Sequence, residues 1–193
     1  MIIGIPSEIK TGEQRVAMSP ANVQSLTDKS VKVLLQANAG RAAGYPDAEY
    51  TAAGATITAN RKEIFASADV ILQVQSFGSN NENSDADLAS LRKGQLVIGM
   101  MDPLASPQAA QAVAEKGASA IALELVPRIS RAQSMDVLSS MATLAGYKAV
   151  LMGASAAPRI FPMLMTAAGT LQPARVLIMG VGVAGLQACA TAK

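Results

Sequence analysis

Histidine and tryptophan are absent from the 193-residue sequence, and cysteine occurs only once. Without histidine the chain has no Ser-His-Asp or Cys-His nucleophile, no histidine metal ligand and no imidazole acid–base group. A single cysteine forms neither an internal disulfide nor a thiolate metal site, which favours a reducing compartment. The net charge of +2 is too small to indicate nucleic acid or an anionic membrane surface as a direct partner.

An export signal and a long apolar run are also missing. The segment Met1–Pro6 has no basic region and no small-residue cleavage site. The longest apolar stretches, such as Val176–Leu186, are shorter than the ~20 residues that a membrane-spanning helix needs. We therefore expect a soluble, cytosolic chain that reaches a membrane only through a partner.

Short and almost continuously apolar runs alternate with alanine-rich amphipathic segments. Such runs are typical of strands buried on both faces of a parallel sheet, and their alternation with helices predicts an α/β domain with right-handed crossovers. The predicted strands are Ile2–Ile5, Val31–Gln36, Ala55–Thr58, Val70–Val74, Gln95–Gly99 and Ala118–Leu123. The predicted helices between them are Pro20–Thr27, Asp47–Ala53, Lys62–Ser67 and Pro107–Lys116.

Two local patterns refine this prediction. Ser19 and Ser106 each precede a proline, so we expect each serine hydroxyl to cap the helix that begins there. The stretch Phe77–Asp87 is rich in asparagine and serine and has no periodicity, so we expect an exposed loop that serves as a connector.

A long helix is predicted to begin near Ser134 and to end at Pro158. Its apolar stripe is formed by Met135, Leu138, Ala142, Ala145, Ala149, Met152 and Ala156. Because these steps of three and four continue for more than twenty residues, we interpret the helix as a bridge between two domains. The predicted division is an α/β domain at 1–133, the bridging helix at 134–157, and the start of a second domain at 158–193.

The second domain begins with a glycine pattern in a suitable context. A predicted strand, Val176–Gly180, leads into the sequence G-x-G-x-x-G at Gly180–Gly185, and a predicted helix follows. In this setting the glycines permit a tight turn and close approach of a pyrophosphate, which the N–H groups of the helix start can bind. The alternative is a turn that merely links strand and helix. An acidic residue for the ribose is expected ~20 positions further on, beyond Lys193, so we expect an incomplete Rossmann domain.

Several segments together are similar to the alpha subunit of the proton-translocating NAD(P) transhydrogenases. The segment Arg128–Asp136 resembles a motif specific to that branch, and the N-terminal motifs resemble a wider superfamily that includes alanine dehydrogenase. The resemblance covers the whole chain and about half of the family's NAD(H)-binding component. The similar segments are Gly4–Glu8, Glu13–Pro20, Pro127–Asp136, Val137–Val150, Thr166–Thr170, Pro173–Arg175 and Gly180–Gly185.

The resemblance implies a site. Catalytic roles fall on Arg128, Gln133 and Asp136, which with Ser139 surround the nicotinamide of NAD(H). These residue types suit a carboxamide, which has one carbonyl acceptor and one NH2 donor. The dinucleotide would also contact Gly180, Gly182, Val183, Ala184 and Gly185. The alternative is that Asp136 only caps the helix and Arg128 is a solvated surface residue.

The resemblance also implies a function and partners. The family transfers a hydride from NADH to NADP⁺, with NADP(H) held on a partner domain, and a membrane domain couples this exchange to proton translocation. The chain would then be cytoplasmic, peripheral at the inner face of the membrane through its partner subunits, and part of a homodimer. No metal and no nucleic acid is expected, and we expect the 193 residues alone to be inactive.

Two alternatives remain open. The chain is either a truncated, non-catalytic interaction or complementation domain, or an oxidoreductase resembling alanine dehydrogenase. That enzyme holds a keto acid with an arginine, a lysine and a histidine. The arginine matches Arg15, but the position aligned with the lysine holds Gln73 and the chain has no histidine. Amino-acid oxidation is therefore disfavoured, and we expect Arg15 to form a structural salt bridge.

Overall fold

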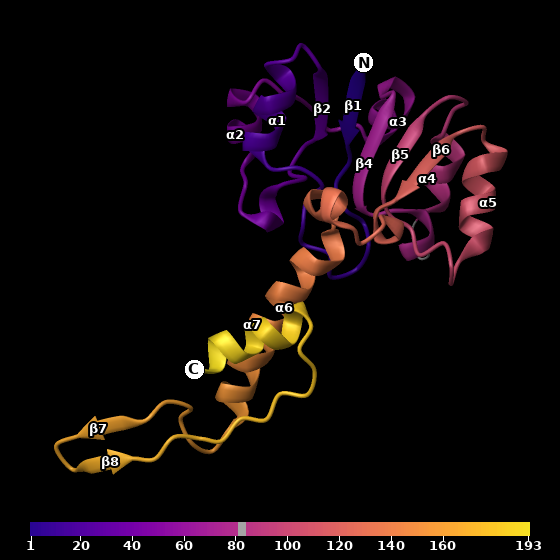
Figure 1. Cartoon of the computed structure of the whole chain (residues 1–193). Helices are drawn as coiled ribbons and strands as arrows, with labels where there is room; N and C mark the ends of the chain where they lie inside the picture. Colours follow the sequence, from indigo (N-terminus) through magenta and orange to yellow (C-terminus); the bar gives the residue numbers. More distant parts are fainter. Residues whose placement is uncertain (81–83) are drawn as a thin grey trace. The chain divides into compact units, whose positions relative to one another are not determined.

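The computed structural model describes residues 1–80 and 84–193, which form two compact units (Figure 1). Unit 1 is Met1–Val126 and unit 2 is Pro127–Lys193. Each unit has its own secondary structure and its own packing. The domain boundaries expected from the sequence, at 133 and 157, stay a prediction.

A six-stranded parallel sheet forms the centre of unit 1. Its strands lie in the order β3-β2-β1-β4-β5-β6, so the chain builds outward from β1 in one direction and then from β4 in the other. The predicted α/β class with a parallel sheet is therefore confirmed. The strands are β1 (Ile2–Ile5), β2 (Lys32–Gln36), β3 (Thr56–Thr58), β4 (Val70–Gln75), β5 (Leu96–Met100) and β6 (Ser119–Ala122).

Five α-helices connect these strands in the part of the chain that the structure describes. Pro20 and Pro107 occupy the first turns of α1 and α5, where a missing N–H costs nothing. Ser19 and Ser106 occupy the N-cap positions as predicted, but the predicted hydroxyl caps are wrong, because neither side chain makes a capping hydrogen bond. The helices are α1 (Pro20–Thr27), α2 (Asp47–Ala52), α3 (Arg61–Ser67), α4 (Asp85–Ser90) and α5 (Pro107–Glu115).

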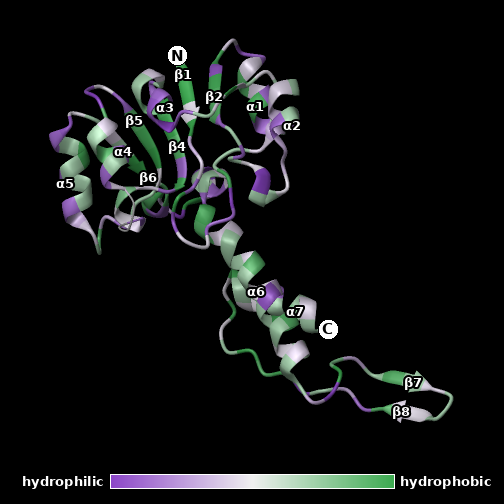
Figure 2. Ribbon diagram, turned by 180° about the vertical axis from the view of Figure 1, so that it is seen from behind, coloured by the Kyte–Doolittle hydropathy of each residue, from purple (hydrophilic) through white to green (hydrophobic). Residues whose placement is uncertain are grey.

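The core of unit 1 lies between the sheet and these helices. Figure 2 shows strands such as β1, β2 and β5 as mostly hydrophobic, as expected for strands that helices cover. One cluster joins Ile5 and Leu35 of the sheet to Tyr50 of α2, and a second joins Ile71 to Phe65 of α3. All five side chains are fully buried. Burial of several large apolar groups, each worth about 1.5–3 kcal/mol, is what stabilises this unit.

The expectation of an exposed loop at Phe77–Asp87 is wrong in part. Phe77 and Asn80 are buried, and α4 begins at Asp85. Asp87 is also buried, because its carboxylate receives two hydrogen bonds from the Arg61 guanidinium at 2.7 and 2.6 Å. The polar composition of this stretch therefore gave no sign of α4, whose first turn forms an ion pair with Arg61 of α3. Asn81, Glu82 and Asn83 lie outside the described residues.

Unit 2 contains two α-helices and a hairpin. The predicted long helix is confirmed as α6 (Val137–Ala156), and α7 (Val183–Ala192) follows the glycine pattern. The hairpin β7 (Leu164–Thr166) and β8 (Gly169–Leu171) was not predicted. The predicted strand Val176–Gly180 is wrong: this segment pairs with no strand among the described residues. Its apolar sequence suits a strand, but a strand needs a hydrogen-bonded neighbour.

A close contact joins α6 to α7. A Cβ on Gly146 would lie 2.1 Å from the carbonyl oxygen of Ala184, so only glycine allows the two helices to approach this closely. Val150 and Ala188 are also buried. By length and composition α6 could cross a membrane, whereas no such stretch was expected from the sequence. This is weak evidence, since the apolar core helix of a soluble protein meets the same criteria.

Candidate functional site

The loop before α6 places the first group of predicted site residues. A 3-10 turn, Ser130–Met135, contains Gln133 and leads to Asp136, which is the N-cap of α6. The backbone carbonyl of Gln133 accepts a hydrogen bond from the Asp136 N–H at 3.2 Å. Both Gln133 and Arg128 are exposed. The structure records no side-chain hydrogen bond for either of them within the described residues.

Asp136 and Ser139 are held together at the start of α6. Asp136 Oδ1 accepts from the Ser139 backbone N–H at 2.9 Å, and Oδ2 accepts from the Ser139 hydroxyl at 2.7 Å. These bonds, followed by the charge of Arg128, hold the pKa of Asp136 below its usual value. The carboxylate is therefore a stable anion, and the capping role suggested as an alternative is present. Each oxygen keeps a second lone pair, so capping leaves room for another donor.

The glycine loop forms the second group. Gly180 has φ +106°, a conformation that favours glycine, and a Cβ on Gly185 would lie 2.1 Å from the Gly180 carbonyl oxygen. The turn itself therefore requires both residues. Gly182 differs: its φ of −70° suits any residue, and a Cβ there would meet no atom within 4 Å. Neither packing nor backbone conformation requires glycine at 182.

The start of α7 offers hydrogen-bond donors next to this open space. Gly182 is the N-cap of a ten-residue helix and provides no side-chain cap. The N–H groups of Val183, Ala184 and Gly185 belong to the first turn, where no carbonyl of the helix can accept from them. A helix start with free N–H groups and a partial positive charge suits a phosphate.

The contact between Gly146 and Ala184 fixes the spacing of the two groups. Ala184 is in the first turn of α7, and Gly146 is seven residues beyond Ser139 on α6. Seven residues of helix correspond to about 10 Å along the axis. Figure 1 shows the start of α7 lying against the middle of α6. Both groups of predicted site residues thus lie on the α6–α7 pair. The Asp136 group lies at the start of α6, and the glycine loop lies beside the middle of α6.

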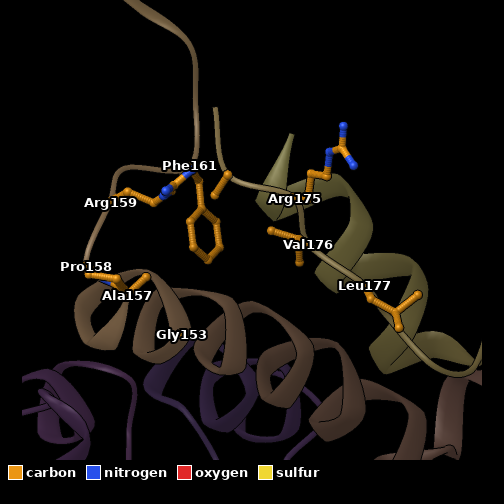
Figure 3. Close-up of a pocket in the computed structure, with 9 residues that line it drawn as sticks. Gly153, Ala157, Pro158, Arg159, Phe161, Arg175, Val176 and Leu177 are labelled. Atoms are coloured by element: carbon orange, nitrogen blue, oxygen red, sulfur yellow. The ribbon is translucent and has the colours of Figure 1, made fainter. Parts of the chain in front are cut away.

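An open pocket lies elsewhere in unit 2 (Figure 3). It has a volume of about 510 Å³ and is formed by the end of α6 and the segments on either side of the hairpin. The Phe161 ring extends toward Gly153, and Arg159 and Arg175 line its rim. None of the predicted site residues lines this pocket, so its volume gives no support to their assignment.

Sequence reasoning gave no role to Glu8, Glu13 and Gln75, which lie in a polar cluster at the carboxyl ends of the unit 1 strands. Glu8 follows β1 and accepts from the backbone N–H groups of Val74 and Gln75 on β4, at 2.6 and 3.0 Å. From β1 the chain continues to β2 on one side of the sheet, and from β4 it continues to β5 on the other side. Ligands of α/β proteins commonly bind where the strand order reverses in this way. Burial raises the pKa of Glu8 despite these bonds. Only the structure shows the order of the strands, and without that order the sequence does not indicate that these residues lie together.

Arg15 lies in the same cluster and forms the expected salt bridge. Its Nε and Nη2 donate to the two carboxylate oxygens of Glu13 at 2.7 and 2.5 Å, and the amide of Gln75 donates to Glu13 at 3.1 Å. The arginine lowers the pKa of Glu13 to about 2. Gln73 is buried beside Ser76, whose hydroxyl donates to the side-chain amide oxygen Oε1 of Gln73 at 3.4 Å. Polar groups at this edge of the sheet are thus hydrogen-bonded to other groups of the same chain.

Comparisons with known proteins relate the whole chain to one family. Residues 4–145 match the alanine dehydrogenase/PNT N-terminal domain, and residues 149–193 match the C-terminal domain of the same family. An NAD(P) transhydrogenase subunit alpha polypeptide of Rhodospirillum rubrum is 47% identical over 193 residues. An alanine dehydrogenase of Mycobacterium tuberculosis is 34% identical over 196 aligned positions.

Solved structures agree with these relatives. The transhydrogenase of Sinorhizobium meliloti matches with a TM-score of 0.91 at 44% identity, and an L-alanine dehydrogenase with 0.84 at 29%. In both cases the match covers the whole of this chain. The chain spans about half of these relatives: 50% of the Rhodospirillum protein and 53% of the Sinorhizobium chain.

Proposed function

The chain belongs to the alanine dehydrogenase/PNT family, and on this premise we propose that it forms the N-terminal half of the NAD(H)-binding component of a proton-translocating NAD(P) transhydrogenase. When bound, NADH would supply the hydride that reduces NADP⁺ on a partner domain. The observation that carries the proposal is Gly182, whose open side-chain position lies beside the free N–H groups of α7.

The glycine loop would hold the pyrophosphate of NAD(H). The N–H groups of Val183, Ala184 and Gly185 donate to phosphate oxygens, and the absent side chain of Gly182 lets the phosphates approach the backbone. Gly180 and Gly185 act on the loop itself, because the turn requires them. The residues present therefore fit this part of a dinucleotide.

The residues before and at the start of α6 would hold the nicotinamide carboxamide. Asp136 accepts from its NH2 group through a lone pair that Ser139 does not use, and Arg128 or Gln133 donates to its carbonyl. The low pKa keeps Asp136 charged and able only to accept. Hydride transfer needs orientation rather than a proton donor, so the absence of histidine is no obstacle.

Partners complete the proposed enzyme. An NADP(H)-binding domain must bring its ring to the nicotinamide site, and a membrane domain couples the transfer to proton movement. The chain would lie in the cytoplasm, peripheral at the inner face of the membrane through those partners. The 193 residues alone would not turn over, because they provide a site for only one of the two nucleotides.

The loop is tested by calorimetric titration with NADH. The protein is a fusion of this chain to the C-terminal half of the Rhodospirillum relative, and the variant is Gly182→Ala. The added methyl group fills the space proposed for the phosphates, so we expect a roughly ten-fold or greater loss of affinity. Gly153→Ala is the matched control, because its Cβ would meet only the Phe161 ring at 3.8 Å. Equal affinity of the two variants would contradict the proposed role of the loop.

The carboxamide site is tested in the same fusion with Asp136→Asn. An asparagine retains a cap but replaces one acceptor oxygen by a donor that opposes the carboxamide NH2. We expect weaker NADH binding with α6 intact, as followed by far-UV circular dichroism. A variant that binds NADH as the unmodified fusion does would leave Asp136 with its capping role alone.

A further inference from the structure

A row of four residues along α6 connects the two groups of the proposed site. Asp136, Ser139, Thr143 and Gly146 follow one another at steps of three, four and three, and such steps keep residues on one face of a helix. The row begins at the pair Asp136 and Ser139 and ends at the glycine that contacts Ala184 of α7. Thr143 is the member of this row that belongs to neither group.

Thr143 lies on the side of α6 that faces α7. Between Met141 and Val150, the buried or half-buried residues are Ala142, Thr143, Gly146 and Val150, whereas the others are exposed. Gly146 is the residue of this side that meets the first turn of α7. Thr143 precedes it by three residues, which is about 4.5 Å along the helix axis. Thr143 therefore lies between the start of α6 and the glycine loop, on the side where that loop packs.

The hydroxyl group of Thr143 uses its hydrogen within the helix. Its Oγ1 donates to the backbone carbonyl of Ser139 at 3.2 Å, and the structure records no other hydrogen bond of this group within the described residues. The oxygen therefore keeps lone pairs with which it can only accept. Threonine is a weaker helix former than alanine, which occupies position 142, and its bond to the preceding turn slightly destabilises a helix. Helix formation thus does not favour threonine at position 143.

The covalent structure of NAD(H) brings a sugar to this position. A ribose joins the nicotinamide to the pyrophosphate. In the proposed function the carboxamide lies at Asp136 and the pyrophosphate lies at the start of α7, beside Gly146. The ribose then crosses the part of α6 between these two points, which is where Thr143 lies. Ribose hydroxyl groups can donate, and the Thr143 oxygen is an acceptor.

We propose that Thr143 is a further cofactor-binding residue, whose hydroxyl oxygen accepts a hydrogen bond from the ribose next to the nicotinamide. The proposal rests on the proposed function, since only NAD(H) bound in that orientation brings a ribose to α6. The contact holds the sugar between the carboxamide site and the glycine loop, and so restricts the position of the nicotinamide ring. Because both partners are neutral, loss of the bond should weaken NADH binding by roughly three- to ten-fold.

The contact is tested by calorimetric titration of the fusion to the C-terminal half of the Rhodospirillum relative, with NADH and separately with ADP. ADP has a pyrophosphate but lacks the ribose next to the nicotinamide. Thr143→Val nearly keeps the shape of the side chain and removes the acceptor. We expect it to weaken NADH binding by roughly three- to ten-fold and to leave ADP binding unchanged. Thr143→Ser keeps the hydroxyl group and should restore most of the NADH affinity.

Thr191→Val is the matched control. The Thr191 hydroxyl donates to the carbonyl of Gln187, four residues earlier, at 2.8 Å, but lies near the end of α7 that is remote from the glycine loop. This variant should bind NADH as the unmodified fusion does. Equal losses of NADH and ADP affinity in Thr143→Val would show that Thr143 only packs α6 against α7, and would overturn the proposal. Unchanged NADH affinity in Thr143→Val would also overturn it and would leave the proposed function intact. An unmodified fusion that binds no NADH would refute the proposed function, and this contact with it.

Discussion

Leucine residues in the two units have opposite environments. Leu35, on β2 of unit 1, is fully buried, whereas Leu177, in unit 2, is 86% exposed. Both lie in apolar runs that predict a strand. In unit 1 the run has a hydrogen-bonded strand on each side, and helices cover it; in unit 2 Val176–Met179 pairs with no described strand. Hydrophobicity therefore specifies a preference for burial, but neighbouring strands decide whether burial occurs.

The largest expected difference comes from the same substitution in both units. Leu35→Ala removes fully buried methyl groups and should lower the free energy of unfolding by about 2–5 kcal/mol. Leu177→Ala removes exposed ones and should change it by less than about 0.5 kcal/mol. Urea unfolding followed by far-UV circular dichroism measures both. Similar losses in the two variants would show that the environment of Leu177 in solution differs from this structure.

A smaller effect is expected inside unit 2, where a glycine rather than an apolar core sets the packing. In Gly146→Ala the new Cβ collides with the Ala184 carbonyl and should weaken the α6–α7 contact by about 1–3 kcal/mol. Hydrogen exchange should show faster exchange of α7 amides and unchanged protection of the unit 1 strands. Gly153→Ala, which has room for a methyl group, should leave α7 protected. Unchanged exchange in Gly146→Ala would refute the close helix contact.

The smallest expected effect is a loss of folding stability in acid, which should come from Glu13 in unit 1. The pKa of Glu13 is lowered to about 2 in the folded chain from an unfolded value of 4.5, so its contribution is present above pH 4.5 and is lost as the pH falls toward 2. Because solvent reaches part of the Glu13–Arg15 pair, the loss between pH 5 and pH 3 should be about 1 kcal/mol.

Glu13→Gln should remove this part of the pH dependence. The measurement is the difference in urea unfolding free energy between pH 5 and pH 3, for the unmodified chain and the variant. Glu8 titrates in both proteins, and its raised pKa acts in the opposite sense. Because the charge of Glu13 helps to raise the pKa of Glu8, the difference between the two proteins reports Glu13 together with its effect on Glu8. An equal loss in both proteins would mean that Glu13 does not provide the acid-labile contact.

Local patterns explain which predictions succeeded. The run Ile2–Ile5 and the proline at the start of Pro20–Thr27 gave the same bounds as the structure, because burial and a fixed φ act within a few residues. The polar stretch before Asp87 misled because its burial depends on Arg61, which lies 26 positions earlier. The hairpin was missed because its strands are short and no turn signal stronger than Gly169 marks them.

The sequence alone determined the α/β class, the glycine loop and the family, since each depends on residue types at short spacing. The tertiary structure decided what composition cannot express. It showed that both oxygens of Asp136 bind Ser139, that packing explains Gly146 and Gly185 but not Gly182, and that Glu8 accepts hydrogen bonds from the end of β4. These facts depend on distances between atoms of different elements, which are set only when the chain folds.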